Sequence, residues 1–366
     1  KNSKVVVKDT KFFHNTAKTM GGALVLSDLP NVEIRQVLFK ANDAFEGSGG
    51  GMFTSCKYLD CKVQFIGDES STTQFIGNTA NIRGAGFAWE NVEPEVENPN
   101  TLVFQNNKAS YGNDISGEPD AIVAINKQGE MIELWRVAEN AQDSSPPTLL
   151  RDFQSGTAIS EEFRFALIDQ YGQVIQSDSS SVAEISLITE TDEEIKNGRV
   201  SNARRTATNG SFDFRDLQLT LTPDTTGIYV ITSETIPDEF RFGVSFRKCR
   251  RGEIHREDQS CYWCGSEIAE SNPDFKTKRR FSLSTNDADC LVCPANAYCW
   301  GGATIGPRAG YWRLHDDSAD ILECPNFSAC LGARPLVDVD LPTGRCDEDN
   351  GYEGALCKEW KDGYVP

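Results

Sequence analysis

The sequence lacks several features that would place it in a common functional class. No apolar run approaches the roughly 20 residues that cross a bilayer as a helix, so we expect no membrane span within this chain. Basic residues are outnumbered, with 36 lysines and arginines against 55 acidic residues, and the net charge of −19 argues against nucleic-acid binding. No signal peptide is visible and the first residue is not methionine, so we expect a processed or internal start.

Catalytic motifs are also missing. The sequence contains no G-x-S-x-G, no phosphate-binding loop and no H-E-x-x-H. The three histidines fall in different parts of the chain: His14, His255 and His315. A polysaccharide lyase or hydrolase would line a groove with acidic residues. The early acidic residues do not recur on one face: Asp9, Asp43, Asp60, Asp68 and Glu69. We therefore expect that the protein is not an enzyme.

Cysteine is absent from residues 62–248 and concentrated after them. Ten of the twelve cysteines lie between residues 249 and 357, about 9% of that segment, which is typical of secreted, disulfide-stapled modules. Two C-x-x-C pairs could instead form a Cys₄ zinc site, but six other cysteines would then need an explanation. We favour disulfides and expect no metal. We predict that all cysteines are paired: Cys56, Cys61, Cys249, Cys261, Cys264, Cys290, Cys293, Cys299, Cys324, Cys330, Cys346 and Cys357.

A repeat occupies the first hundred residues. The pattern F-x-x-N-x-A occurs four times, at intervals of 27, 36 and 29 residues, and each copy is followed by glycine. Periods of this size indicate a stacked architecture. The runs between the glycines are short, β-branched and aromatic, which favours strands over helices. The repeated residues are Phe12, Asn15, Phe39, Asn42, Phe75, Asn78, Phe104 and Asn107.

Stacking these repeats predicts that each strand pairs in parallel with its equivalent in the next repeat, about 4.8 Å away. The phenylalanines would form an internal aromatic stack and the asparagines an amide ladder. The glycines would turn corners that require positive φ or close backbone approach. Small side chains would face inward at Ala17, Ala44, Ala80 and Ala109. An ordinary β-sandwich with coincidental Asn-Gly turns is the alternative.

The sequence F-x-x-N-x-A followed by G-G-A resembles the polymorphic outer membrane protein type of repeat, found in right-handed parallel β-helices of surface proteins. The resemblance covers about residues 1–118. This chain departs from it in the long second interval, which contains CKYLDC, and we expect Cys56 and Cys61 to close a small loop there. An uncapped first coil would expose unpaired backbone groups, so we expect further coils of a longer precursor or another molecule to cover it.

The middle segment shows strands and turns without cysteines. EEFRFALIDQYGQVI and GSFDFRDLQLTLTPDTTGIYVITSE alternate apolar and polar residues between turn signals, which indicates a β-sandwich. The stretch from Asp169 to Val174 is similar to immunoglobulin-like modules of surface adhesins. Pro146 and Pro147 indicate a stiff linker. Residues 120–138 would form a strand pair that caps the repeats or belongs to the sandwich.

The last segment resembles EGF-like or ephrin-receptor-like modules, which occur in large protist surface proteins downstream of β-helix repeats. The resemblance is carried by Gly-Tyr-Trp-Arg at 310–313 and Gly-Tyr-x-Gly at 351–354. Trp360 stands where family members often have cysteine, so the final module departs from the pattern. Apolar residues are too few here to hold a core. Each disulfide would stabilise the folded state by about 2 to 4 kcal/mol, because it reduces the conformational entropy of the unfolded chain.

Two further features suggest modification or ion binding. Asn209-Gly-Ser and Asn326-Phe-Ser match the glycosylation sequon. The stretches DVDLP and DEDNGYEG could bind calcium through clustered oxygens, although a solvated acidic loop is favoured. We expect no other cofactor.

The sequence therefore predicts an all-β chain in three parts. Residues 1–118 would form a right-handed parallel β-helix, residues 119–248 an immunoglobulin-like β-sandwich, and residues 249–366 a cysteine-rich EGF-like or ephrin-receptor-like region. The disulfides and the resemblances imply an extracellular or cell-surface location.

We favour an extracellular structural protein, a self-assembling component of a cell-surface fibre or coat. Its partners would be other copies of itself or related surface proteins. The alternative is an adhesin or receptor ectodomain that binds a partner or a glycan. A carbohydrate-active enzyme is the least favoured hypothesis. The molecular mass in solution distinguishes the structural protein from the ectodomain, because a structural scaffold would polymerise and an ectodomain would stay monomeric.

Overall fold

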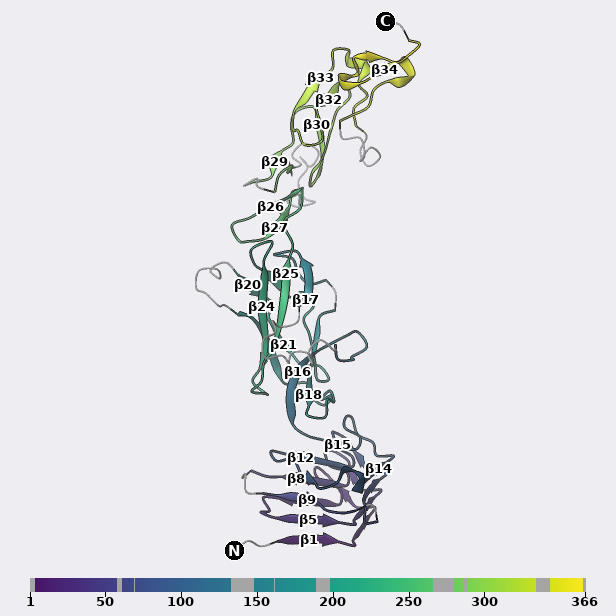
Figure 1. Cartoon of the computed structure of the whole chain (residues 1–366), viewed down its shortest axis with the longest axis vertical. Helices are drawn as coiled ribbons and strands as arrows, with labels where there is room; N and C mark the ends of the chain where they lie inside the picture. The colour runs from purple at the N-terminus through teal and green to yellow at the C-terminus, as the bar shows by residue number, and fades with distance from the viewer. Residues whose placement is uncertain are drawn as a thin grey trace.

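The computed structural model describes residues 4–57, 61–68, 70–132, 148–160, 162–188, 198–265, 280–285, 289–333 and 343–364. Strands and single-turn 3-10 helices make up the regular structure of these residues, so the all-β prediction is confirmed at this level. Figure 1 shows an elongated molecule with β1 near one end and β34 near the other. The predicted linker at Pro146 and Pro147 lies outside the described residues.

Residues 5–116 form four small parallel sheets, which the chain visits in the same order in each repeat. We call one passage through the four sheets a rung. The first rung contains β1 (Val5–Lys8), β2 (Lys11–Phe13), β3 (Thr16–Ala17) and β4 (Leu24–Ser27). The second contains β5 (Val32–Arg35), β6 (Leu38–Lys40), β7 (Asp43–Ala44) and β8 (Met52–Ser55). The third contains β9 (Val63–Phe65), β10 (Thr73–Ile76), β11 (Thr79–Ala80) and β12 (Phe87–Glu90). The fourth contains β13 (Glu95–Val96), η1 (Pro99–Thr101), β14 (Leu102–Gln105) and β15 (Ile115–Ser116).

The register of these sheets stacks equivalent residues of successive repeats. Phe39 of β6 pairs with Phe12 of β2 and with Phe75 of β10, which in turn pairs with Phe104 of β14. The long second interval does not shift this register, because β9 still pairs with β5 and β10 with β6. Its extra residues lie at two corners, in the connection from β8 to β9 and in the longer connection from β9 to β10, residues 66–72.

The glycine that follows each repeat turns a corner. The first glycine of the corner has a φ of +57° at Gly21, +72° at Gly49, +59° at Gly84 and +59° at Gly112. L-residues with side chains rarely adopt this conformation. Close approach adds a second constraint at Gly50, where a Cβ atom would lie 2.2 Å from the carbonyl oxygen of Thr79.

The described residues between 119 and 246 form two larger, mostly antiparallel sheets and one strand pair. The orders are β16-β18-β22, β17-β25-β24-β19-β21 and β20-β23. The strands are β16 (Pro119–Ile125), β17 (Thr148–Phe153), β18 (Arg164–Asp169), β19 (Val182–Ile188), β20 (Arg199–Ser201), β21 (Arg204–Thr206), β22 (Ser211–Asp213), β23 (Gln218–Thr220), β24 (Thr226–Ser233) and β25 (Phe240–Phe246). The pairing of β16 with β18 assigns residues 119–125 to these sheets, not to the parallel ones.

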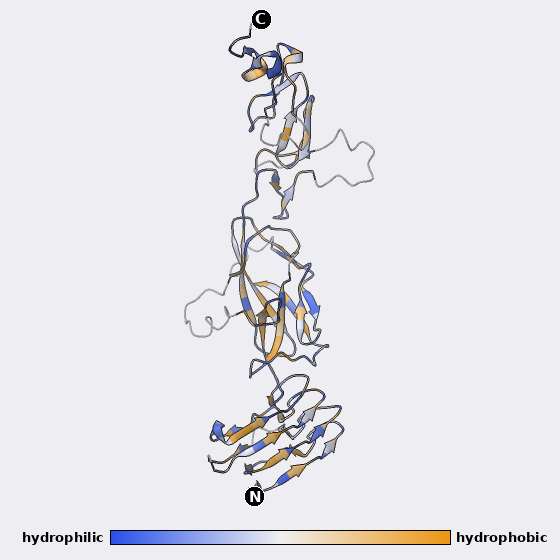
Figure 2. Ribbon diagram, turned by 90° about the vertical axis from the view of Figure 1, so that its right-hand side faces the viewer, coloured by the Kyte–Doolittle hydropathy of each residue, from blue (hydrophilic) through white to orange (hydrophobic). Residues whose placement is uncertain are grey.

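Both larger sheets contribute to one apolar core. Phe165 of β18 and Phe212 of β22 are buried with Tyr229 of β24 and Phe242 of β25. Figure 2 shows apolar residues in orange along the strands of this region and of the four rungs. Hydrophobic burial therefore stabilises both groups of sheets.

The described residues after β25 form short hairpins held by disulfides. The elements are β26 (Glu253–His255), β27 (Cys261–Trp263), β28 (Arg280–Phe281), β29 (Leu291–Val292), β30 (Ala297–Gly301), β31 (Thr304–Pro307), β32 (Tyr311–Arg313), β33 (Ile321–Glu323), η3 (Phe327–Ala329), η4 (Glu348–Asn350), β34 (Tyr352–Glu353), η5 (Ala355–Cys357) and β35 (Glu359–Trp360). Arg313 is buried and donates to the carbonyl oxygens of Ser318 and Ile305, both at 2.7 Å. Trp360 packs against Tyr352 across its hairpin, with ring centroids 4.7 Å apart and ring planes tilted by 37°.

Candidate functional site

The asparagines of the repeat form a continuous chain of hydrogen bonds. The Nδ2 group of Asn15 donates to Oδ1 of Asn42 at 2.9 Å, Asn42 to Asn78 at 3.0 Å, and Asn78 to Asn107 at 3.0 Å. The backbone N–H of each donor residue reaches the same oxygen at 3.0 Å. Each bond joins neighbouring rungs, so this asparagine ladder specifies their register as well as their order.

The phenylalanines of the repeat stack beside the ladder. Ring centroids lie 5.0 Å apart from Phe12 to Phe39, 4.7 Å from Phe39 to Phe75 and 5.3 Å from Phe75 to Phe104, with planes within 10° of parallel. Offset stacking at such distances contributes about 0.5 to 1.5 kcal/mol per pair beyond burial. The small side chains of Ala44, Ala80 and Ala109 form a separate contact cluster.

The first rung exposes positions that the following rungs bury. Val5 is 38% exposed, whereas its partner Val32 is fully buried. Asn15 is exposed, whereas Asn42 and Asn78 are fully buried. All four strands of the first rung are the last strands of their sheets among the described residues. We call this surface the first-rung edge; it presents unpaired backbone groups and partly exposed apolar side chains together.

The opposite end of the ladder stops at a carboxylate. Asn107 Nδ2 donates to Oδ1 of Asp114 at 2.9 Å, where a further rung would have placed another asparagine. The fourth rung is also bonded to the sheets that follow it in the chain. Nε2 of Gln173, which lies just after β18, donates to the carbonyl oxygen of Ile115 in β15 at 2.9 Å. The two ends of the stack therefore differ, because only the fourth rung has a partner within the described chain.

Asp169 organises this junction from a buried position. Its Oδ1 atom accepts from the N–H groups of Tyr171 and Gln173, both at 3.0 Å, and its Oδ2 atom accepts from the N–H of Gly117 at 3.3 Å. Burial raises the pKa of Asp169, although these N–H groups counteract the rise. One carboxylate thus joins the end of β18 to the segment that leaves the fourth rung.

Tyr171 makes a second contact across the junction. Its hydroxyl accepts from Trp89 Nε1 at 3.1 Å and donates to Glu93 Oε1 at 2.6 Å. Burial, followed by the bond to Glu93, raises the pKa of Tyr171 far above its usual range, so the hydroxyl keeps its proton. No sequence motif signals the contact between Trp89 and Tyr171, which lie 82 positions apart in the chain.

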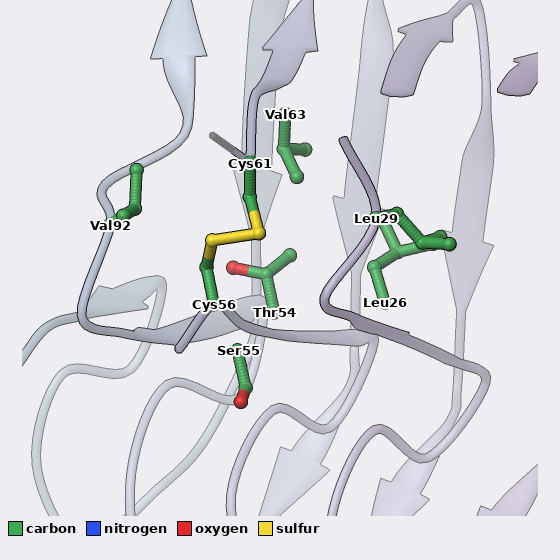
Figure 3. Close-up of a pocket in the computed structure, with 8 residues that line it drawn as sticks. All are labelled: Leu26, Leu29, Thr54, Ser55, Cys56, Cys61, Val63 and Val92. Atoms are coloured by element: carbon green, nitrogen blue, oxygen red, sulfur yellow. A yellow bond between two sulfur atoms is a disulfide. The ribbon is translucent and has the colours of Figure 1, made fainter. Parts of the chain in front are cut away.

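A small cavity lies beside the Cys56–Cys61 disulfide (Figure 3). Its volume of about 10 Å³ matches the smallest space that accommodates one water molecule. The lining comes from several rungs, including Leu26, Thr54 and Val63, and Thr54 Oγ1 is buried there without a hydrogen-bond partner. The cavity is too small for a sugar or a peptide side chain.

The titratable residues that we considered for catalysis do not converge. Asp43 accepts a hydrogen bond from the hydroxyl of Thr79 at 2.6 Å, and Asp68 accepts bonds from Ser70 and Ser71 within its own turn. These bonds from Ser70 and Ser71 lower the pKa of Asp68. Asp9 and His14 are exposed on the first rung. Asp60 and Glu69 lie outside the described residues.

All twelve cysteines form disulfides. The pairs are Cys56–Cys61, Cys249–Cys261, Cys264–Cys290, Cys293–Cys299, Cys324–Cys330 and Cys346–Cys357. The two C-x-x-C motifs are therefore split between three disulfides and offer no thiolate to zinc. The Cys249–Glu253–Cys261 group has the spacing of metal ligands, but its sulfurs are bonded to each other.

The two sequons and the acidic loops differ in their surroundings. Asn209 is exposed at a turn with a φ of +49°. The amide of Asn326 begins η3: its Oδ1 accepts from Ser328 N at 3.3 Å, and its Nδ2 donates to Tyr352 Oη at 2.7 Å. Asp347 of DEDNGYEG similarly accepts from Asn350 Nδ2 at 2.7 Å at η4. The stretch DVDLP lies outside the described residues.

No protein-family model matches the chain, and no curated protein matches it. Among solved structures, a crystal structure of domains 4 and 5 of the S-layer protein SbsC is similar over 36% of this chain, with 12% sequence identity and a TM-score of 0.19. The match spans 55% of that structure's own length. A similarity of this size does not establish a shared fold. Among the described residues, none of the helices has the length and apolarity to cross a membrane.

Proposed function

We propose that the chain is an extracellular structural protein, a rod-like component of a cell-surface fibre or coat that assembles through its first-rung edge. In this proposal residues 1–118 are a right-handed parallel β-helix, residues 119–248 an immunoglobulin-like sandwich and residues 249–366 a set of EGF-like or ephrin-receptor-like modules. The repeated visiting order of the four sheets, the shared core of the middle sheets and the disulfide-linked hairpins support this reading.

One observation carries the proposal. Within the described residues the four rungs stack in one parallel register, and a further rung, from this polypeptide or from another copy, would extend that stack at the first-rung edge toward one extremity of an elongated molecule (Figure 1). An open strand edge is a template for pairing with another chain. Placed at the end of a rod, it favours end-on association over lateral clustering.

The disulfides support an extracellular location. The chain has six disulfides, five of them after residue 248, where the described residues form only small apolar clusters such as the one around Phe281 and Ile305. Such bonds persist in oxidising compartments and are rare in the reducing cytosol. The glycosylation sequons at Asn209 and Asn326 are compatible with secretion.

Sedimentation velocity and electron microscopy of the secreted protein test the proposal. In oxidising, calcium-containing buffer we expect species of higher mass that grow with concentration and appear as extended particles. A protein that stays monomeric at high concentration contradicts the proposal and favours the ectodomain alternative. Cleavage of pectin-like or chitin-like polymers would instead indicate an enzyme.

A pair of variants links the association to the proposed surface. Asn15→Lys places a long cation on the first-rung edge, where it obstructs an incoming strand. Asn100→Lys makes the same substitution at an exposed position of η1. We expect the first variant to reduce association and the second to leave it unchanged; equal association of both contradicts the assigned surface.

A further inference from the structure

The outward face of the sheet β14-β10-β6-β2 carries cations without carboxylates. We propose that this face binds an acidic polysaccharide, a polymer of sugars that carry carboxylate or sulfate groups. The inference goes beyond the proposed function and does not depend on it, because the face consists of side chains that point away from the stack. A rung added at either end of the stack would lengthen this face and would not cover it.

The register identifies the side chains of this face. The phenylalanines of the repeat point from these strands into the apolar core of the rungs. Because successive side chains of a strand point to opposite sides of a sheet, the residues on either side of each phenylalanine point outward. Leu38, Ile76 and Val103 are apolar, yet among the described residues they do not belong to that core. We call the eight outward residues the lysine face: Lys11, Phe13, Leu38, Lys40, Gln74, Ile76, Val103 and Gln105.

The two cations of the lysine face are close together and available. Lys11 pairs in register with Leu38 and Lys40 with Phe13, so the two lysines are diagonal neighbours on adjacent strands. Strand spacing and rise place the Cβ atoms of such neighbours about 8 Å apart. Both lysines are exposed, and within the described residues neither ammonium group has an ion-pair or hydrogen-bond partner. One anionic chain can therefore contact both.

The outward face of the sheet β1-β5-β9-β13 shows the opposite arrangement. Lys4 and Arg35 both pair with Glu33 there. Lys62 pairs with Glu95 at 2.9 Å. Carboxylates of the chain itself thus neutralise the cations of that face. The lysine face contains no acidic residue, so an external anion does not compete with one.

The net charge of −19 does not cancel this attraction. Exposed charges are screened over about 8 Å at physiological ionic strength, and the carboxylates after β25 lie toward the other end of an elongated molecule (Figure 1). Two carboxylates belong to neighbouring segments of the rungs. Asp9 pairs with Lys8 at 3.5 Å, and Asp43 accepts from a threonine hydroxyl. The local charge at Lys11 and Lys40 therefore decides which ligands bind.

The other groups of the lysine face suit sugars. Phe13 is 44% exposed and offers a flat apolar surface to the C–H side of a sugar ring. The side-chain amides of Gln74 and Gln105 can donate and accept, which matches sugar hydroxyls. A small ligand needs a concave site that buries most of its surface, whereas an open sheet face suits an extended polymer. Nucleic acid is disfavoured, because its affinity comes from many phosphate contacts and this face offers two cations.

Binding of charge-matched variants to immobilised polymers tests the inference. The polymers are polygalacturonate, which carries carboxylates, dextran sulfate, which carries sulfates, and neutral dextran. The variant Lys11→Glu/Lys40→Glu reverses the charge of the lysine face. The control Lys127→Glu/Lys358→Glu makes the same change at exposed lysines outside the rungs, so both variants go from a net charge of −19 to −23. In about 0.15 M salt we expect the parent protein to bind an acidic polymer, the first variant to bind about tenfold more weakly, and the control to bind as the parent does.

The outcomes separate this inference from the proposed function. A preference for polygalacturonate or for dextran sulfate identifies the anionic group and supports the inference. Absence of binding, equal binding of the two variants, or equal binding to neutral dextran overturns it. Melting curves of both variants verify that they fold. Sedimentation without polymer measures self-association separately: a loss confined to Lys11→Glu/Lys40→Glu would assign the lysine face to a second copy and overturn the inference.

Discussion

The side-chain amide of Asn42 donates to Oδ1 of Asn78 at 3.0 Å, although the two residues are 36 positions apart in the chain. Both side chains are fully buried. A buried amide is stable only if its donors and acceptors are satisfied, so each asparagine depends on the rungs on both sides.

Asn78→Ala should therefore destabilise the parallel stack strongly. The substitution removes Asn78 Oδ1, which accepts from the N–H and the Nδ2 of Asn42, and it leaves Oδ1 of Asn107 with only the backbone N–H of residue 78 as a donor. We expect a loss of about 3 kcal/mol of local stability, measured by hydrogen exchange in β6, β10 and β14. Asn15→Ala is the matched control at the exposed end and should cost about 1 kcal/mol. Equal losses would show that burial of the ladder is unimportant.

Tyr171→Phe should loosen the junction between the fourth rung and β18. It removes the hydroxyl that bonds Trp89 and Glu93, and the buried indole N–H of Trp89 loses its acceptor. We expect a loss of about 1 kcal/mol and faster cleavage of residues 117–119 by a non-specific protease. Tyr298→Phe, at an exposed position of β30, should leave the cleavage rate unchanged. Unchanged cleavage in both variants would contradict the role of Tyr171.

The contact between β25 and the first disulfide-linked hairpin should weaken in acid. The carboxylate of Glu253 is buried and accepts from Arg247 Nη2 at 2.7 Å and from Arg250 N at 2.7 Å. Burial raises the pKa of Glu253, but these bonds outweigh it and hold the pKa below its usual value.

Because the pKa of Glu253 is lower in the folded protein than the unfolded value of about 4.3, its carboxylate stabilises the fold at pH values above about 4.3. This stability is lost as the pH falls through the pKa of the folded state. We expect the melting temperature to be constant near neutrality and to fall below about pH 4. Glu253→Gln should be less stable at pH 7 and show a smaller fall in acid. Glu348→Gln removes an exposed ion pair with Lys361 and should behave as the parent protein.

Replacing the Cys264–Cys290 disulfide by serines should cost more stability than replacing Cys293–Cys299. The first closes a separation of 26 residues and the second a separation of 6. The chain-entropy relation gives about 3.5 and about 2.4 kcal/mol, a difference of about 1 kcal/mol. Thermal unfolding of the two double-serine variants, compared with the parent protein, measures this order. The reverse order would show that strain or packing dominates over loop entropy.

The two sequons should respond differently to substitution by glutamine. Asn209 is exposed, so Asn209→Gln should remove a glycan at only a small cost in stability, which arises because glutamine tolerates the φ of +49° less well than asparagine. Asn326→Gln should destabilise the protein by about 1 kcal/mol, because it removes the side chain that begins η3. Mass spectrometry of the protein from a secreting host, together with melting curves, separates the two effects. An unglycosylated Asn209 would contradict the first expectation.

The sequence by itself determined the local chemistry of the rungs. Short β-branched runs, glycines at positive φ and one F-x-x-N-x-A per repeat indicate parallel strands with equivalent residues in register, because identical spacing returns each side chain to the same position. The concentration of cysteine similarly indicated disulfides, since a segment with little apolar surface needs covalent links.

Only the tertiary structure decided the relationships between distant residues. Cys261 pairs with Cys249 and Cys264 with Cys290, and spacing alone permits many other pairings. The contact of Tyr171 with Trp89 and the end of the ladder at Asp114 also depend on chain segments that meet in space. A repeat specifies which residues are equivalent, but the direction of a hydrogen bond and the choice of a remote partner follow from the folded geometry.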